Sequence, residues 1–322
     1  MNPSKILLTG GTGFIGSRLC ERLALDYKLP YRVLVRNFTH APRIARLGAE
    51  MVGGDLDDSG SLDRALVGCD TVVHLAYSEG PQTRTLVRAC RKAGIKRLVH
   101  ISSIAVHGAD PGPEAAHEAT ARIGRYPGQE YSNLKAQAEL VIQHAIGDGL
   151  PAVILRPTIV YGPYGPFVIS IVEAARDRGV FTMLDEGRGI CNAVYVDDVC
   201  DAILTAIESN EGIGSAFFIT ADNAVTWREF QSRLRANGGA GAAHHQPQLG
   251  RSPAVLGVPA ADFQERHRGA QSTRYVSRVP PAPLLGGHVP YPHHGREATR
   301  DECSTARSSD CVEGSQGGTA YA

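Results

Sequence analysis

The sequence has no excess of charge of either sign and no long apolar run. Lys and Arg together number 33, as do Asp and Glu, so the formal net charge is zero. This balance gives no electrostatic support for binding nucleic acid or an anionic membrane. No apolar run approaches the ~20 residues that a membrane-spanning helix needs. The opening residues, MNPSKILLTG, lead straight into a predicted strand and leave no room for a signal peptide. We therefore expect a cytoplasmic protein.

The sequence also lacks the spacing of a metal site or a disulfide framework. Its seven cysteines are scattered, form no C-x-x-C pair and are odd in number, which fits a reducing compartment. His293 and His294, with Cys303 and Cys311, match no standard ligand pattern. We expect no metal.

Residues 239–322 contain no Lys, Ile or Met, yet they hold six of the twelve His and eight of the nineteen Pro. They show no sustained periodicity, and such a segment cannot bury enough apolar surface to offset the entropy of ordering. We predict a tail of low order. We hypothesise that it is out-of-frame translation of a GC-rich gene, with a native disordered tail as the alternative. An intact reading frame in the source gene would contradict the first hypothesis.

The first 160 residues alternate apolar, strand-like runs with helix-like segments. The runs lie near residues 5–8, 32–35, 50–53, 71–75, 97–101 and 152–155, and the helical segments include 85–93 and 131–146. This alternation predicts an α/β fold with a doubly wound parallel sheet.

After Pro157 the pattern loosens. Helices are predicted at 168–178, 199–208 and 226–236, with a short strand at 216–220. We interpret residues 1–160 as an NAD(P)-binding domain and 161–238 as a small substrate lobe. That lobe looks incomplete, and some of its segments are expected to return to the main sheet.

A glycine-rich stretch, TGGTGFIG at residues 9–16, lies between the first apolar run and a helix-like segment. Gly10, Gly13 and Gly16 lack a Cβ, so the backbone can turn tightly and approach a pyrophosphate. The following helix would direct its free N–H groups and positive dipole end at that anion. A glycine triplet alone is a weak signal, but the order strand, glycine turn and helix indicates a dinucleotide site.

Arg36 ends the second apolar run, where a carboxylate would accept the ribose hydroxyls of NAD. A guanidinium can instead hold a ribose 2′-phosphate with two hydrogen bonds, so the sequence favours NADP over NAD. The alternative is a solvent-facing Arg without a ligand. Asp55 and Leu56 follow the third run, where they could meet the adenine, although the nearby Asp58 is equally placed to cap the next helix.

Tyr131 and Lys135 are four residues apart in a predicted helix and therefore share one face. A nearby ammonium stabilises a phenolate and lets a tyrosine act as an acid or base near neutral pH. Ser102 and Ser103 follow the fifth run, at the sheet edge where such folds bind ligands. We expect Ser103 to hydrogen-bond a substrate oxygen, with a Ser pair capping a turn as the alternative. An amphipathic helix with one exposed Lys is the alternative for Tyr131 and Lys135.

Together these residues resemble the extended short-chain dehydrogenase/reductases, the NAD-dependent epimerase/dehydratase family. The resemblance covers roughly the first 235 residues, in family order. The matching stretches are TGGTGFIG at 9–16, GDL at 54–56, HLA at 74–76, ISSIAVHG at 101–108, YSNLK at 131–135, LRPTIVYGP at 155–163 and VYVDDVCDAI at 194–203.

The resemblance implies a Rossmann-type domain, hydride transfer at a carbinol carbon, a small-molecule substrate and, commonly, a cytoplasmic homodimer. In that scheme Tyr131 moves the hydroxyl proton, Lys135 binds the ribose and lowers the tyrosine pKa, and Ser103 orients the substrate oxygen. The other residues that we expect to hold the cofactor are Thr12, Phe14, Ile15, Leu75, Ala76, Pro157 and Ile159, beside the three glycines, Arg36, Asp55 and Leu56.

The sequence departs from the family at two places that bear on the substrate. After Ala76 few residues precede the next helix, where relatives carry a longer loop. Sugar-nucleotide epimerases often place an Arg on the substrate pyrophosphate, whereas this sequence has Cys191 at the matching position. Asn192, which follows it, is a predicted substrate contact, and Arg188 lies shortly before it.

We expect a nucleotide-sugar epimerase or dehydratase, the most frequent use of the family. An NADPH-dependent ketone reductase of the dihydroflavonol or hydroxysteroid type is the alternative, which both Arg36 and the missing pyrophosphate Arg favour. A non-catalytic dinucleotide sensor is a third possibility, against which Ser103, Tyr131 and Lys135 argue.

Overall fold

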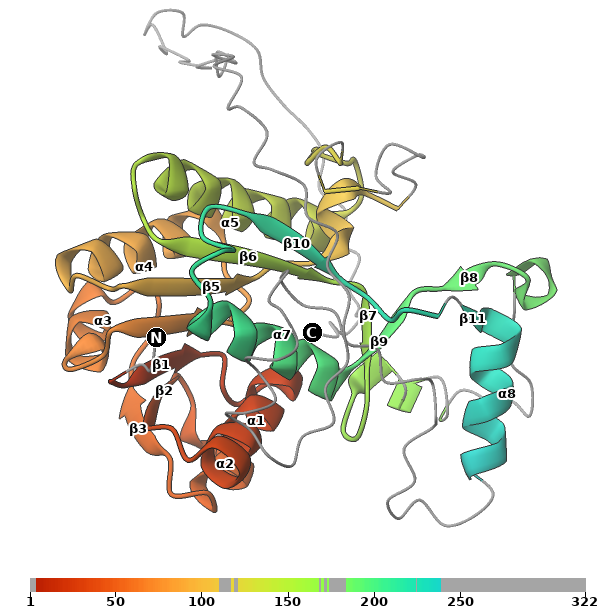
Figure 1. The fold of residues 1–322 in the computed structure, drawn as a ribbon, viewed down its shortest axis with the longest axis horizontal. Coiled ribbons are helices and arrows are strands. Elements are labelled where there is room, and N and C mark those ends of the chain that lie inside the picture. The colour runs from red at the N-terminus through yellow and green to blue at the C-terminus, as the bar shows by residue number, and fades with distance from the viewer. Residues whose placement is uncertain are drawn as a thin grey trace, which may run out of the picture. The chain divides into compact units, whose positions relative to one another are not determined.

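Seven strands form the central sheet of this computed structural model, which describes residues 4–109, 117–118, 121–167, 169–170, 173, 184–223 and 225–238 (Figure 1). The strand order is β10-β6-β5-β4-β1-β2-β3, and every neighbouring pair is parallel. The strands are β1 (Ile6–Thr9), β2 (Tyr31–Val35), β3 (Glu50–Gly53), β4 (Thr71–His74), β5 (Arg97–Ile101), β6 (Ala152–Pro157) and β10 (Ala216–Ile219). The predicted Rossmann-type parallel sheet is confirmed.

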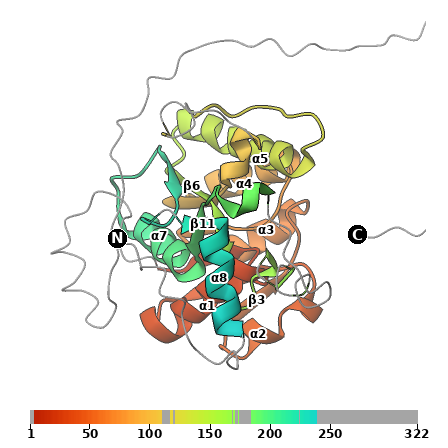
Figure 2. The same cartoon turned by 90° about the vertical axis from the view of Figure 1, so that its right-hand side faces the viewer.

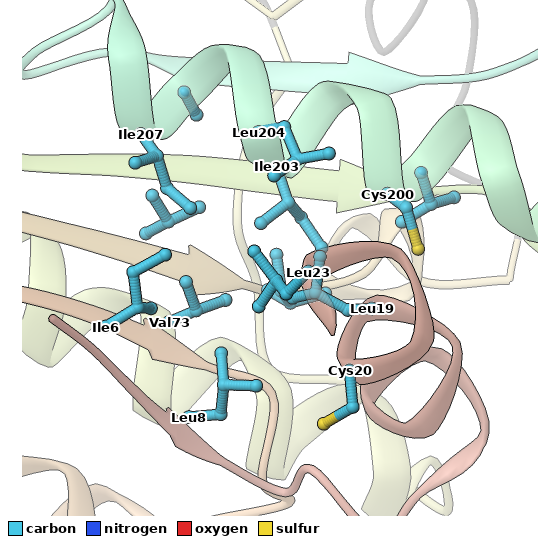
Figure 3. Close-up of a cluster of buried hydrophobic side chains, with 14 of the residues drawn as sticks. Ile6, Leu8, Leu19, Cys20, Leu23, Val73, Cys200, Ile203, Leu204 and Ile207 are labelled. Carbon is cyan, nitrogen blue, oxygen red and sulfur yellow. The ribbon is translucent and has the colours of Figure 1, made fainter. Parts of the chain in front are cut away.

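Helices cover both faces of this sheet, which explains why its central strands are continuous apolar runs. One face carries α1 (Phe14–Glu21), its π-helical continuation η1 (Arg22–Tyr27) and α7 (Val196–Glu208), and the other carries α3 (Ser59–Leu66), α4 (Gly80–Lys92) and α5 (Glu130–Gly147) (Figure 2). Figure 3 shows the first of these layers, where Leu19 and Leu23 meet Ile203 of α7 above Ile6 and Leu8 of β1.

Two helices begin earlier than the apolar periodicity predicts. The helix predicted from residue 85 begins at Gly80, because Glu79 and Gln82 form a capping box and Pro81 lies in the first turn. The helix predicted from residue 199 begins at Val196, with Asp197 and Asp198 in its first turn, where carboxylates interact favourably with the helix dipole.

The segment after Pro157 divides between the main sheet and two small sheets. Strand β10 pairs with β6 at the sheet edge, and α7 packs beside α1. The small sheets pair β7 (Ile159–Tyr161) with β9 (Ala193–Tyr195) in parallel, and β8 (Ile190–Cys191) with β11 (Val225–Thr226) antiparallel. Helix α8 (Trp227–Gly238) packs on the second pair.

The remaining elements are short: η2 (Phe38–His40), α2 (Pro42–Ala45), η3 (Ile104–His107) and η5 (Leu184–Gly187). Most of the helix predicted at 168–178, and the tail at 239–322, lie outside the described residues. None of the helices in the described ranges combines the length and hydropathy needed to cross a bilayer. The described residues contain no cluster of three or more His, Cys, Asp or Glu that could hold a metal ion.

Candidate active site

The glycine turn after β1 packs against the chain that follows β4, at the point where the strand order reverses. Gly10 has φ +74°, and a Cβ there would lie 2.5 Å from the backbone nitrogen of Ala76. A Cβ on Gly16 would lie 2.2 Å from the carbonyl oxygen of Gly10. Only glycine fits both positions, so the turn stays close to the backbone of Ala76.

Backbone donors line the start of α1. The Gly13 N–H donates to the Gly10 carbonyl (3.1 Å), and the Ser17 N–H makes the first helical hydrogen bond to the Gly13 carbonyl (2.8 Å). Because they come before this first helical hydrogen bond, the N–H groups of Phe14, Ile15 and Gly16 have no acceptor within the helix. A helix N-terminus of this kind suits a pyrophosphate, so the turn fits a dinucleotide. Thr12, half-buried, lies in the same turn.

The predicted adenine-side residues lie near the ends of β2 and β3. The side chain of Arg36 is 82% exposed, and its Nε forms a long ion pair with Asp55 Oδ2 (3.9 Å). Asp55 Oδ1 accepts a hydrogen bond from the backbone of Asp57, whereas Asp58 caps α3 by accepting from the Gly60 N–H (2.9 Å).

Apolar residues are predicted to form the other walls of the cofactor site. Leu56 is buried beside α3, and Leu75 is half-buried, with its N–H donating to the Thr9 carbonyl (3.0 Å). Pro157 ends β6, and Ile159 begins β7. Leu56 and Leu75 thus follow β3 and β4, which are not adjacent in the sheet, and Ile159 belongs to the small β7–β9 sheet.

Tyr131 and Lys135 share one face of the first turns of α5. The Tyr131 side chain is 51% exposed, whereas Lys135 is buried and its Nζ donates to the Ile101 carbonyl at the end of β5 (3.1 Å). Burial lowers the pKa of Lys135 to about 8, while the carboxylate of Glu139 partly opposes this shift. The ammonium is thus held under the exposed tyrosine, close to the strand end.

The two serines after β5 have different partners. Ser102 is buried and its hydroxyl donates to the carboxylate of Glu139. Ser103 is half-buried and its Oγ accepts from the backbone N–H of Ala105 (3.2 Å), which caps η3. The turn-capping alternative therefore describes an existing contact of Ser103, but the hydroxyl proton of Ser103 is still available for donation to a substrate oxygen.

The residues of the predicted sugar-nucleotide contact have different surroundings. Cys191 is buried in the small apolar cluster with Tyr161 and Phe230. Asn192 is exposed, and its carbonyl accepts from the Ile159 N–H (3.0 Å), which places it beside the predicted nicotinamide wall. Arg188 is paired with Asp185 (2.5 Å).

The sequence did not predict three features near the carboxyl edge of the sheet. Tyr77, in the short loop after β4, stacks on Tyr131. Glu139 and Arg156 form a fully buried ion pair beneath the serines, signalled in the sequence by an Arg within the apolar run of β6 and a Glu one turn after Lys135.

The third feature is a pair of stacked, buried histidines, His74 and His100, whose ring centroids are 5.1 Å apart. His74 bonds to Thr9 Oγ1 (2.7 Å) and Ser78 Oγ (2.9 Å). His74 belongs to the HLA stretch that resembles the family, but the sequence does not predict that it stacks on His100.

Comparisons with known proteins agree with this geometry. A model of the NAD dependent epimerase/dehydratase family matches residues 6–219. The 4-hydroxy-2-methyl-3-oxo-4-farnesyl-3,4-dihydroquinoline-1-oxide ketoreductase of Stigmatella aurantiaca is 30% identical over 244 residues, covering 71% of this chain and 72% of that protein. The 2-alkyl-3-oxoalkanoate reductase of Stenotrophomonas maltophilia is 29% identical over 263 residues, covering 73% and 76%.

Among solved structures, the UDP-glucose 4-epimerase of Thermus thermophilus, in complex with NAD, superposes with a TM-score of 0.59 at 26% identity, covering 73% of this chain and 83% of that one. The resemblance read from the motifs is therefore confirmed. This chain belongs to the NAD dependent epimerase/dehydratase family, whose members are NAD(P)-dependent epimerases, dehydratases and reductases.

Proposed function

We propose that this protein is an NADPH-dependent reductase that converts a ketone with a substantial apolar body into a secondary alcohol. The observation that carries the proposal is the exposed Tyr131 above the buried Lys135, beside a second exposed tyrosine, Tyr77. An apolar ring or chain of a ketone can pack against such an aromatic wall.

The protein's own groups supply the proton and the orientation. When bound, the reduced dinucleotide supplies a hydride to the carbonyl carbon. The phenol O–H of Tyr131 donates its proton to the carbonyl oxygen, which becomes the alcohol. The ammonium of Lys135 stabilises the phenolate left on Tyr131, and the Ser103 hydroxyl donates a hydrogen bond that holds the same oxygen.

Three further observations favour a reductase over the nucleotide-sugar function that the sequence analysis put first. Cys191 is buried and Arg188 is paired with Asp185, so neither is disposed to bind a substrate pyrophosphate. Arg36 is exposed at the position suited to a 2′-phosphate, which supports NADPH. Two relatives at 29% and 30% identity are themselves a reductase and a ketoreductase.

Epimerization of a nucleotide sugar is the second candidate, favoured by the likeness to UDP-glucose 4-epimerase. An epimerase regenerates its cofactor in each cycle, so it consumes none. From the family resemblance alone we also propose a homodimer in the cytoplasm, which light scattering and cell fractionation test.

The experiment is an NADPH-consumption assay with cyclic and 2-alkyl-3-oxo ketones, beside UDP-hexoses. We expect one NADPH oxidised per ketone reduced. Tyr131→Phe should lower kcat by about 10²-fold or more, and Tyr27→Phe, remote on η1, should not. UDP-hexose interconversion without net NADPH loss would contradict the proposal, as would unchanged turnover in Tyr131→Phe.

A further inference from the structure

Three polar side chains form a row on the inner face of α5. Tyr131, Lys135 and Glu139 are spaced four residues apart, so they lie above one another on one side of the helix. Exposure falls along the row, from the half-exposed Tyr131 to Lys135 and then to Glu139, which has no exposed surface. The row lies against the end of β5, because Lys135 contacts its last residue, Ile101, and Glu139 contacts the next residue, Ser102.

Lys135 and Glu139 hold consecutive residues of the turn that carries Ser103. Lys135 Nζ donates to the Ile101 carbonyl (3.1 Å), and the Glu139 carboxylate accepts from the hydroxyl of Ser102. The Ser102 N–H donates to the Leu155 carbonyl of β6 (2.7 Å). The backbone entering Ser103 is thus held from both α5 and β6.

The carboxylate of Glu139 is itself held by β6 and by α5. Arg156 donates to Glu139 Oε1 through Nη2 (2.5 Å) and Nε (3.0 Å), and Gln143 Nε2 donates to the same oxygen (3.0 Å). The Arg156 guanidinium also lies 5.8 Å from the ring centroid of Phe218 on β10. A buried ion pair is weak evidence for stability, because well-packed apolar side chains often replace it without loss. A role in the site explains the pair better.

We propose that Glu139 is a positioning residue that fixes the Ser103 turn to α5 and keeps a counter-charge beside Lys135, so that the serine, the tyrosine and the ammonium meet at one substrate oxygen. The proposal rests on the proposed catalytic roles of Ser103, Tyr131 and Lys135. The geometry of the turn and the charge state of Lys135 can nevertheless be measured without any substrate.

The electrostatic part follows from the groups around Lys135. His74 on β4 and His100 on β5 face it, and their imidazoles are buried with lowered pKa values, so they stay neutral near pH 7. Tyr131 and Glu139 flank Lys135 on α5, and Arg156 forms an ion pair with Glu139. The Glu139 carboxylate raises the pKa of Lys135 against the effect of burial. Removing its charge must lower the pH at which Lys135 loses its proton.

The first experiment measures Lys135 directly. In protein labelled with ¹³C at lysine Cε, the Lys135 resonance, assigned with Lys135→Met, is followed against pH in the wild type and in Glu139→Gln. The expected midpoint is about 8 in the wild type and lower in Glu139→Gln. Gln143→Met serves as the matched control, because it removes one hydrogen bond to the same carboxylate without changing charge. Its midpoint should equal that of the wild type.

The second experiment measures the turn. Hydrogen exchange of amides 103–106, at a pH and temperature where each variant is fully folded, should become faster in Glu139→Gln and in Ser102→Ala. If Glu139→Gln does not fold because Arg156 is left unpaired, the double variant Glu139→Gln/Arg156→Met takes its place. In the ketone assay, both turn variants should lose about tenfold in kcat with little change in KM, and only the Glu139 variant should move the pH profile.

The outcomes separate this inference from the proposed function. A variant that loses only thermal stability, with wild-type Lys135 titration and wild-type exchange in the turn, would overturn the positioning role. Absence of ketone reduction in the wild type would overturn the proposed function and leave the titration and exchange results to decide the positioning of the turn.

Discussion

The rings of Tyr77 and Tyr131 stack with their centroids 5.9 Å apart and their planes 10° from parallel. Both side chains are about half exposed, at 54% and 51%. Tyr77 comes from the short loop after β4, and Tyr131 from the first turn of α5. The short loop therefore places an aromatic ring beside Tyr131, the proposed proton donor. The pKa of Tyr77 is raised, mainly by desolvation and to a smaller extent by the neighbouring Tyr131. Tyr77 therefore remains a neutral phenol.

We predict that Tyr77 selects substrates by packing. Tyr77→Ala should raise KM for an aromatic or long-chain ketone about 2- to 10-fold, the loss expected for an aromatic contact of about 0.5–1.5 kcal/mol. Tyr77→Phe keeps the ring and should keep KM. Steady-state kinetics on a large and a small ketone make the comparison. An equal effect of Tyr77→Ala on both ketones would contradict a packing role.

Arg36 should decide between the two dinucleotides. Arg36→Ala should weaken NADPH binding about tenfold or more and leave NADH binding nearly unchanged, because only NADPH carries the 2′-phosphate. Fluorescence titration of both cofactors measures this, with Arg64→Ala, another exposed arginine, as the control. Tighter binding of NADH than NADPH by the wild type would show that Arg36 is a solvent-facing side chain.

The buried ammonium of Lys135 should lower the free energy of unfolding. Its pKa of about 8 lies below the ordinary 10.5, so the unfolded chain binds more protons between these values and stability rises with pH across that window. Below pH 8 the full cost, about 3 kcal/mol, is present. Lys135→Met should therefore gain about 2 kcal/mol at pH 7, after losing the bond to Ile101, and should abolish activity. Urea unfolding at pH 7 and pH 10 tests it: a variant less stable than the wild type at pH 7 would refute the argument.

The buried histidines should make the fold sensitive to acid. Burial lowers the pKa of His74 from 6.5 to about 3, so the unfolded state binds the extra proton between these values and stability falls as the pH drops through that range. His100 shifts in the same direction. Among the described residues, neither ring nitrogen of His100 has a hydrogen-bond partner.

His100→Met should therefore fold with near wild-type stability at pH 7 and lose less stability in acid, by about 1.4 kcal/mol per pH unit. Thermal melts from pH 7 to pH 4.5 measure the slope. If wild type and variant have equal slopes, His100 does not contribute to the acid sensitivity.

The sequence by itself was sufficient for the sheet and the dinucleotide turn. Both depend on features within a few residues of each other: continuous apolar runs that need cover on two faces, and glycines whose missing Cβ lets Gly10 and Gly16 pack against backbone. It also allowed Ser103, Tyr131 and Lys135 to be proposed as one site, because the carboxyl ends of parallel strands share an edge.

Only the tertiary structure decided what surrounds that site. The stack of Tyr77 on Tyr131 and the pairing of Glu139 with Arg156 depend on how far α5 is rotated and shifted against β5 and β6, and no local pattern encodes that. The same holds for Cys191, whose burial beside Phe230 follows from pairing of β8 with β11 across some thirty residues of chain. Local preferences specify elements, whereas the packing of their side chains specifies which polar groups lose water and which partners they find.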